Sequence, residues 1–212
     1  MDTDQLIKTL AADNAHRARP VSLVLALALL AAAPVSIFMF MAELGVRPDV
    51  MTAMHNPFFD LKFAVTLALA AAAITISLHL ARPEASLRGF VWLLAIPAGL
   101  LVAGISGEIM MPQRLPMMTR LVGSNSKVCM TAVPLMSLPL LAASLLGLRH
   151  GAPTRPAVAG AMAGLLSAGL AATLYASHCT DDSPLFVATW YSIATALMAA
   201  LGALIGSRML KY

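Results

Sequence analysis

Six uninterrupted apolar stretches dominate this 212-residue chain. A helix needs roughly 20 mostly apolar residues to cross the hydrocarbon of a bilayer, and each stretch has about that length. The stretches are rich in Leu and Ala and are apolar continuously rather than at alternate positions, which predicts helices and not the strands of a barrel. The predicted spans are Val21 to Ala42, Phe63 to Leu80, Gly89 to Met111, Val128 to Leu148, Pro156 to Ser177 and Leu185 to Gly206.

The composition agrees with a membrane protein, because 59% of the residues are hydrophobic and only 11% are charged, far from the average soluble chain. We therefore expect an all-α integral membrane protein. Residues 1–20 would form an N-terminal segment, residues 21–206 a bundle of six transmembrane helices, and residues 207–212 a short tail. No cluster of Lys and Arg predicts nucleic-acid binding, so membrane lipids are the surroundings to expect.

The basic residues predict the orientation. Nine of the fourteen Lys and Arg residues lie in the N-terminal segment, the second and fourth loops and the C-terminal tail. By the positive-inside rule, both termini then face the cytoplasm of a bacterial inner membrane. Tyr175, Trp190 and Tyr191 lie near the outer helix ends, where aromatic side chains usually sit at the interface.

The chain has two cysteines, Cys129 and Cys179, and this orientation puts both on the outer side. There is no CxxC pair and no Cys/His cluster at zinc spacing, so any sulfur chemistry joins these two positions or uses them with other ligands. A disulfide needs Cα atoms within ~7 Å, which the sequence does not determine. A sensor of oxidants or metals, a permanent structural disulfide and two unrelated buried thiols all remain open.

The two thiols have different neighbours. Ser126 is a candidate N-cap, which would put Cys129 in a first helical turn beside Lys127, where the helix dipole and the ammonium both favour a thiolate. Cys129 is then the expected reactive sulfur. Cys179 precedes two aspartates that oppose ionisation, and His178 beside it is a candidate base or ligand, so Cys179 suits a resolving or ligating role.

Methionines add a second type of soft ligand. Nine of the fourteen fall on or near the outer side, and thioethers with thiolate and imidazole suit a copper-like ion. Met is also an ordinary apolar filler of membrane helices, and no spacing here is specific for a metal. We expect no obligatory cofactor, only transient capture of a soft ion, with Cys129, Cys179, His178 and Met130 as the candidate ligands.

The predicted spans lack ionisable residues at mid-depth, which argues against a pump or an ion-coupled transporter. They carry small residues at a spacing of four, a pattern typical of close helix packing. We expect contacts within one bundle, with a homodimer as the alternative. The small-residue runs are Gly160-x-x-x-Gly164, Gly202-x-x-x-Gly206 and the set Gly99, Ala103 and Gly107.

The N-terminal segment predicts a short amphipathic helix, because Leu6, Ile7 and Leu10 share one helical face. Such a helix either binds a partner protein or lies on the membrane surface as an anchor. The pattern alone favours neither.

Several motifs together resemble one known family. They are Asp4-Gln5-Leu6-Ile7, Arg47-Pro48-Asp49 with Lys62, Gly151-Ala152-Pro153-Thr154-Arg155-Pro156, and His178-Cys179-Thr180-Asp181-Asp182-Ser183-Pro184 followed by Trp190-Tyr191. Through these the chain resembles, over nearly its whole length, the NrsF-type membrane anti-sigma factors of proteobacteria, which pair with extracytoplasmic-function sigma factors.

The resemblance implies a six-span inner-membrane protein that is not an enzyme. Its cytoplasmic N-terminal segment would hold a sigma factor inactive, with Leu6, Ile7 and Leu10 as the contact face. Its outer cysteines, Cys129 and Cys179, would sense oxidant or metal stress. Two other classes are weighed against it: a small permease, which would need a polar path, and a membrane thiol oxidoreductase, which usually needs a CxxC relay.

Overall fold

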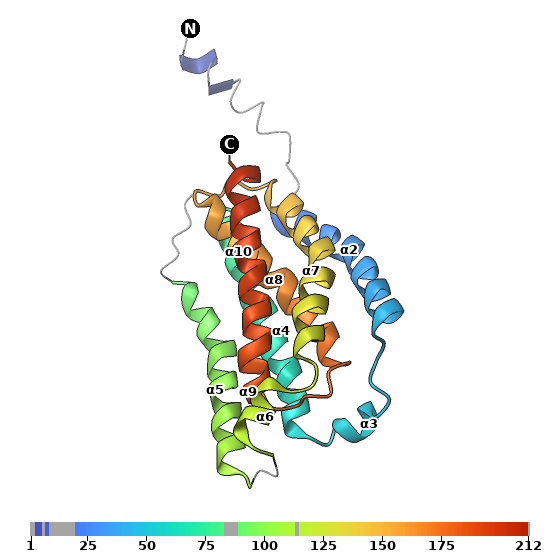
Figure 1. Cartoon of the computed structure of the whole chain (residues 1–212). Helices are drawn as coiled ribbons and strands as arrows, with labels where there is room; N and C mark the ends of the chain where they lie inside the picture. Colours follow the sequence, from blue (N-terminus) through green and yellow to red (C-terminus); the bar gives the residue numbers. More distant parts are fainter. Residues whose placement is uncertain (1–2, 6, 9–19, 83–88, 113–114, 212) are drawn as a thin grey trace.

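The computed structural model describes residues 3–5, 7–8, 20–82, 89–112 and 115–211. Six helical segments are long and apolar enough to cross a membrane, and the described residues contain no strand, which confirms an all-α membrane bundle. α2 begins and α10 ends at the same end of the bundle (Figure 1). The elements are α2 (Val21–Glu43), α3 (Val50–Ala53), α4 (Pro57–Leu80), η1 (Val91–Leu94), α5 (Ala95–Met110), α6 (Met117–Val122), α7 (Ser126–Leu148), α8 (Pro156–Ala176), α9 (Pro184–Phe186), η2 (Val187–Tyr191) and α10 (Ser192–Met209).

Helix α8 is the centre of the bundle. It packs against α10, α4 and α7, and it is the most buried of the six spans. α2 and α5 lie at the periphery, with 17% and 11% of their most apolar windows buried. Most of their surface is therefore left to face lipid.

The contact between α8 and α10 is made backbone to backbone. A Cβ on Gly160 would collide with the Gly202 carbonyl and lie 2.9 Å from the Gly206 Cα atom. The prediction that these two glycine motifs form contacts within the bundle is confirmed. The expectation for Gly99 and Ala103 was wrong, because both are exposed. Gly107, the third member of that set, does face α4: its Cβ would lie 4.0 Å from the Phe58 ring, and a Cβ on Gly104 would meet Leu61 of the same helix.

Helix α4 is longer than the hydrophobicity pattern predicted. It begins at Pro57 rather than Phe63, with the Asn56 side chain accepting from the Phe58 N–H at 3.1 Å. Lys62, which we assigned to a loop, therefore lies in its second turn and is buried. A buried Lys is tolerated in such a helix only where it is paired, and its partners are described below.

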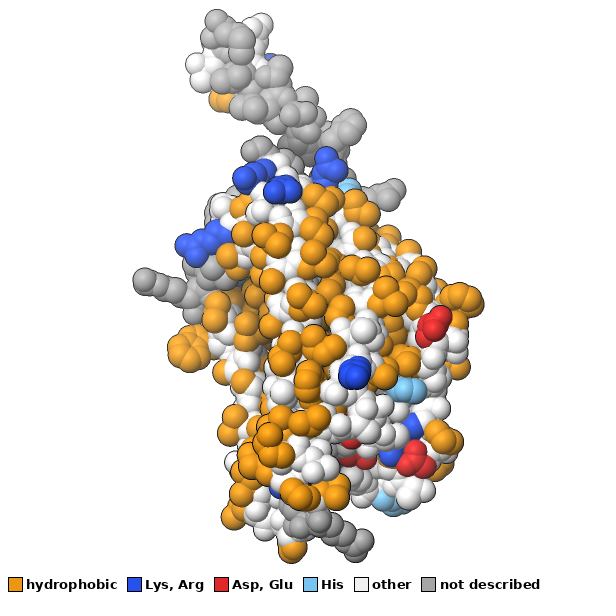
Figure 2. Space-filling view, viewed as in Figure 1, with side chains coloured by type: hydrophobic (Ala, Val, Ile, Leu, Met, Phe, Trp, Pro, Cys, Tyr) orange, Lys and Arg blue, Asp and Glu red, His pale blue; other side chains and the backbone are white. Residues whose placement is uncertain are grey.

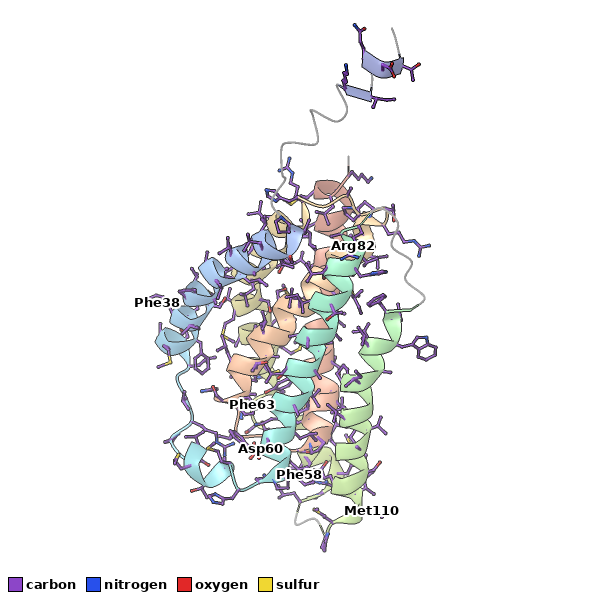
Figure 3. The ribbon with its side chains drawn as sticks, turned by 180° about the vertical axis from the view of Figure 1, so that it is seen from behind. Phe38, Phe58, Asp60, Phe63, Arg82 and Met110 are labelled. Atoms are coloured by element: carbon purple, nitrogen blue, oxygen red, sulfur yellow. The ribbon has the colours of Figure 1, made fainter. Side chains whose placement is uncertain are left out.

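The charges divide between the two ends of the bundle. Lys and Arg side chains gather at the end where α10 finishes, and Asp and Glu lie toward the other (Figure 2). From behind, Arg82 lies at the first end, and Asp60, Phe58 and Met110 lie toward the second (Figure 3). We refer to these as the terminal end and the loop end.

The predicted sigma-binding residues fall largely outside the described part of the chain. Leu6 and Leu10 are not among the described residues. Ile7 is, and it is helical and 58% exposed. The amphipathic face therefore stays a prediction.

Candidate functional site

The two cysteines come together at the loop end of the bundle. Cys129 lies in the first turns of α7 and Cys179 in the connection after α8, and both belong to one hydrophobic cluster with Tyr175, Phe186 and Tyr191. Both thiols are free and completely buried. An oxidant or a metal ion can therefore reach the sulfur atoms only if this part of the protein opens.

Two tyrosines pack in the same cluster as the thiols. The rings of Tyr175 and Tyr191 have centroids 5.7 Å apart, and the buried Tyr191 hydroxyl has no hydrogen-bond partner among the described residues. Tyr175 also donates to the Asn125 carbonyl at 3.2 Å. We expected both tyrosines at the membrane interface, but both are buried. Tyr191 ends a π-helical turn, η2, a local geometry that occurs often at functional sites.

A pair of cations holds the Cys179 backbone. The Lys62 ammonium donates to the Cys179 carbonyl at 2.8 Å and to Asp182 Oδ1 at 2.7 Å. Arg47 Nη1 donates to the same carbonyl at 3.2 Å and to Asp182 Oδ1 at 3.0 Å. The Phe59 ring lies below both cations, 5.1 Å from the Lys62 nitrogen. This charge-assisted arrangement explains how a Lys with no exposed side-chain surface is stabilised.

Arg47 also pairs with Asp49 at 2.7 Å. The hydrogen bond from Arg47 lowers the pKa of Asp49, and the same hydrogen bond is the main cause that raises the pKa of Arg47. The Arg47-Pro48-Asp49 motif and Lys62, distant in sequence from Cys179, thus meet its loop in space.

Asp181 connects the same loop to the start of α7. Its carboxylate accepts from the Ser124 N–H at 3.0 Å and from the Asn125 N–H at 2.8 Å. We expected Ser126 as the N-cap, but α7 already includes Ser126, and Asn125 precedes it without a side-chain cap of its own. Gly123, at φ +59°, has the left-handed backbone that this close approach requires.

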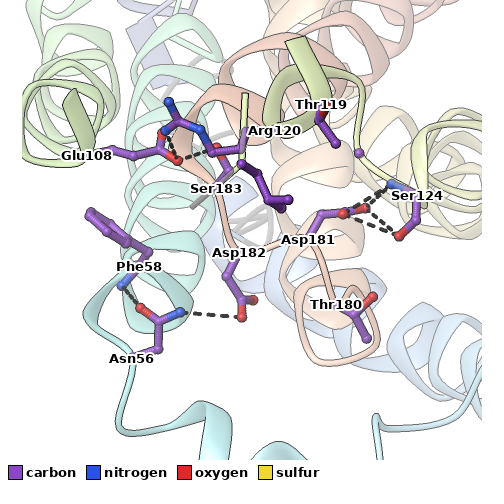
Figure 4. Close-up of a pocket in the computed structure, with 12 residues that line it drawn as sticks. Asn56, Phe58, Glu108, Thr119, Arg120, Ser124, Thr180, Asp181, Asp182 and Ser183 are labelled. Atoms are coloured by element: carbon purple, nitrogen blue, oxygen red, sulfur yellow. Dashed lines mark hydrogen bonds and ion pairs between the residues drawn. The ribbon is translucent and has the colours of Figure 1, made fainter. Parts of the chain in front are cut away.

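Ser183 connects the loop to α5 and α6. Its hydroxyl donates to Glu108 Oε1 at 2.7 Å, and Arg120 on α6 pairs with the same oxygen at 2.8 Å. Figure 4 shows these groups around a cavity of about 510 Å³ at the loop end. The residues 179–183, which we call the cysteine loop, therefore contact side chains or backbone of α4, α5 and the turns before α3 and α7, and reach Arg120 of α6 through Glu108.

The surroundings of the two thiols differ from those predicted. Lys127, the cation expected beside Cys129, is exposed, whereas Cys129 has no exposed surface. Burial raises the pKa of the Cys179 thiol, and the nearby Lys62 opposes this shift. The structure thus puts a buried cation, Lys62, beside Cys179 and not beside Cys129. The prediction of a reactive Cys129 relied in part on Lys127, which is exposed.

The candidate metal ligands are not assembled into a recognised site. Among the described residues, no group of three or more His, Cys, Asp or Glu is arranged to hold a metal ion. His178 Nδ1 lies 3.0 Å from the Gly45 carbonyl, and Met130 packs against the outside of the cysteine cluster. A soft ion would need these side chains to rearrange.

The sequence pointed to the cysteines but missed the groups that hold them. Apart from their place in the family motif, Asp181 and Asp182 were considered only for their effect on thiol ionisation. Tyr191 was placed at the membrane interface, and Glu108 and Arg120 were given no role. The one available signal was a Lys at the edge of an apolar stretch, Lys62, together with two acids beside Cys179, since opposite charges at buried positions tend to pair.

Comparison with known proteins identifies the family. Residues 10–212 match the family described as NrsF, negative regulator of sigma F. The chain belongs to this family. It is 34% identical to the anti-sigma-F factor NrsF of Caulobacter vibrioides and 32% identical to the probable anti-sigma-F factor NrsF of Azospira oryzae, over the full length of each protein. No solved structure matches the chain.

Membership in the NrsF family confirms the resemblance noted in the sequence and points to a regulatory protein rather than an enzyme. The motifs that carried that resemblance now have positions. Arg47 and Lys62 both donate to the Cys179 carbonyl and to Asp182. The motif from Gly151 to Pro156 lies at the opposite, terminal end of the bundle.

Proposed function

We propose that this NrsF-family chain is an inner-membrane anti-sigma factor. Its N-terminal segment would hold an extracytoplasmic-function sigma factor in the cytoplasm, through Leu6, Ile7 and Leu10, with both termini on that side. Oxidation of Cys129 and Cys179 on the outer side would release the sigma factor. The family match supports the anti-sigma role.

The observation that carries the sensing step is the position of Cys179 in a loop held by four other parts of the chain. Lys62 and Arg47 bind its carbonyl, Asp181 binds the start of α7, and Ser183 binds Glu108 on α5. A new bond at this sulfur would displace the loop. Because the loop contacts several spans, their packing would change together.

The oxidation balances with a hydroperoxide as the oxidant. One thiol attacks the peroxide, the O–O bond breaks, and a sulfenic acid and an alcohol or water form. The second thiol then attacks the sulfenic sulfur, the Sγ–Sγ bond forms and water leaves. Two thiols and one hydroperoxide thus give one disulfide, with both thiol protons carried off in the products. The alternative stimulus is a soft metal ion, which would bind to Cys129, Cys179, His178 and Met130 and displace the cysteine loop in place of the disulfide.

The energy that the signal must supply can be stated. Converting a sigma factor from mostly bound to mostly free takes ~5.5 kcal/mol of differential binding. A disulfide that closes a loop of about fifty residues lowers the entropy of the unfolded chain by ~4 kcal/mol in the chain-entropy model, which does not favour one folded arrangement over another. The difference between the two folded arrangements would come from the contacts that the cysteine loop loses.

The N-terminal contact is tested by changing Leu6 and Leu10 to Asp in the full-length chain. We expect sigma-dependent transcription to become constitutive in a reporter strain, while the amount of chain in the membrane fraction stays unchanged. A matched control changes Lys8, which lies on the other side of the predicted helix, to Asp and should keep inhibition. Full inhibition by the Leu6→Asp, Leu10→Asp chain would place the contact elsewhere.

The permease and thiol oxidoreductase alternatives have their own readouts. Substrate flux into proteoliposomes would support the first, and turnover of a dithiol substrate would support the second. The described spans offer neither a charged path at mid-depth nor a CxxC relay, so we expect neither activity.

A further inference from the structure

A cluster of exposed arginines at the terminal end is not explained by the cysteine site. Arg82 follows α4, Arg149 follows α7, Arg155 precedes α8 and Arg208 lies in the last turn of α10. All four are exposed, as is Lys211. Four elements that are distant in sequence thus bring positive charge to one face, which we call the basic face.

Contacts between the chain segments show that three of these arginines surround one loop. The Ala152 N–H donates to the Ala81 carbonyl at 3.0 Å, which joins the loop of residues 151–155 to the position before Arg82. On the other side, a Cβ on Gly206 would lie 3.0 Å from the Pro156 carbonyl. The end of α10, with Arg208, therefore lies against the start of α8, with Arg155.

The loop itself is held in place. A Cβ on Gly151 would lie 2.8 Å from the Ala81 carbonyl, so only a glycine allows this approach. Pro153 is buried, whereas Ala152, Thr154 and Arg155 are exposed. This loop is the Gly151 to Pro156 motif of the sequence, and its geometry presents Arg155 from a pinned backbone.

No acid of the described bundle pairs with Arg82, Arg155 or Arg208. Among the ion pairs between described residues, none involves Arg82, Arg155 or Arg208. Figure 2 shows the acidic side chains of that view away from the basic face. The Asp and Glu residues described in the bundle all belong to the loop end: Glu43, Asp49, Asp60, Glu108, Asp181 and Asp182.

We propose that the basic face is a second docking surface for the sigma factor, and that it binds an acidic patch on that protein. This inference rests on the proposed function and adds to the N-terminal contact. Anionic lipid headgroups are the other source of negative charge, but α8 is the central helix, enclosed by α4, α7 and α10. Arg155 at its start lies inside this ring of helices, whereas headgroups surround the bundle.

A surface of this kind sets the rate and orientation of association, because opposite charges steer the partner and salt screens the attraction. The contact through the N-terminal segment would then act on a partner already placed against the bundle. Two linked contacts also raise the total affinity by effective concentration.

The test uses the full-length chain in nanodiscs of phosphatidylcholine, which carries no net charge. The probe is the purified sigma factor that the wild-type chain inhibits. We expect the Arg155→Glu, Arg208→Glu chain to bind it about ten-fold more weakly at 150 mM salt, with a shallower dependence of affinity on salt. The control is Lys127→Glu, an equal change in charge per site at an exposed position of the loop end, which should bind like wild type.

Each other outcome decides against the proposal. Unchanged affinity of the double variant would overturn the docking surface and leave the anti-sigma role intact. A loss seen only in nanodiscs with phosphatidylglycerol would assign the basic face to lipid and would also overturn it. Failure of the wild-type chain to bind any sigma factor would overturn the proposed function, and the docking surface with it. Equal unfolding temperatures of the double variant and wild type exclude misfolding as the cause.

Discussion

Lys62 of α4 donates a hydrogen bond of 2.8 Å to the backbone carbonyl of Cys179, from a side chain with no exposed surface. The same ammonium pairs with Asp182 at 2.7 Å. The position of one of the two cysteines therefore depends on a buried charge pair rather than on apolar packing alone. Such a pair contributes little net stability when intact, but breaking it leaves a charge without its partner.

Replacing Lys62 by Met tests this dependence. We expect the bundle to lose about 3 kcal/mol of stability, because Asp182 keeps Arg47 but loses its closest cation. The midpoint of thermal unfolding in detergent measures the loss, and faster maleimide labelling of Cys179 in a Cys129→Ser background measures opening of the loop. Lys127→Met, which removes an exposed ammonium at the same end, should change neither. Equal stability and labelling in the two variants would contradict a holding role for Lys62.

The pH dependence of alkylation tests the electrostatics of Cys179. Burial raises its pKa and Lys62 opposes the shift, so the thiol is neutral at physiological pH. Its neutral form contributes stability fully below the ordinary thiol pKa of ~8.5, and the contribution is lost as the pH rises through the folded pKa. In the Cys129→Ser chain, the rate of alkylation by iodoacetamide should therefore reach its half-maximum at a higher pH than in a model peptide.

The Lys62→Met change should move this midpoint to still higher pH, because it removes the cation that stabilises the thiolate. The midpoint, unlike the rate itself, does not depend on how often the loop opens. A midpoint equal to that of the peptide would mean that Cys179 ionises as an exposed thiol does.

The sequence was sufficient for the parts of the fold that depend on hydrophobicity alone. Six continuous apolar stretches gave six helices, and the glycines at a spacing of four on α8 and α10 gave their contact. It was insufficient where a charge enters the bundle. Lys62 looked like a loop residue because its partner, Asp182, is 120 positions away, and only the folded chain shows that the two meet.

The same limit applies to the cysteines. The charge pattern put Cys129 and Cys179 on one side, and the structure brings them into one cluster. The chemical difference between them was predicted from sequence neighbours, Lys127 and the two aspartates, whereas in the fold their surroundings come from α4, α8 and η2. Helix periodicity predicts which face is buried, but it does not predict which buried groups face one another.

The packing of α8 on α10 gives a prediction for stability. Gly160→Leu should destabilise the bundle by ~2 kcal/mol or more, because its side chain would collide with the backbone around Gly202 and separate the helices. Gly99→Leu is the control, since no atom lies within 4 Å of the position of its Cβ. Thermal unfolding of both variants in the same detergent measures the difference. Comparable changes in the two variants would show that the contact with α10 does not set the effect, because Leu has the higher helix propensity at both positions.

The roles of the two sulfur atoms are separated by single substitutions. If the pair senses oxidants by forming a disulfide, Cys129→Ser and Cys179→Ser should each keep the sigma factor bound under peroxide, because neither can close the Sγ–Sγ bond. The remaining thiol should stop at a sulfenic acid, which a dimedone probe detects by mass spectrometry. The cation at Lys62 predicts that Cys179 forms this adduct faster than Cys129 does, the reverse of the order expected from sequence neighbours.

A soft-metal signal predicts a different pattern in the same strains. Either serine variant would then weaken the response to the metal without trapping an oxidised adduct, and His178→Ala would weaken it further because it removes a candidate ligand. A normal response of both serine variants to peroxide and to metal would make the buried thiols structural. Release of the sigma factor from the N-terminal segment would then need another signal. The cysteine loop, which Lys62, Arg47 and Glu108 hold in place, would be the first region to test for it.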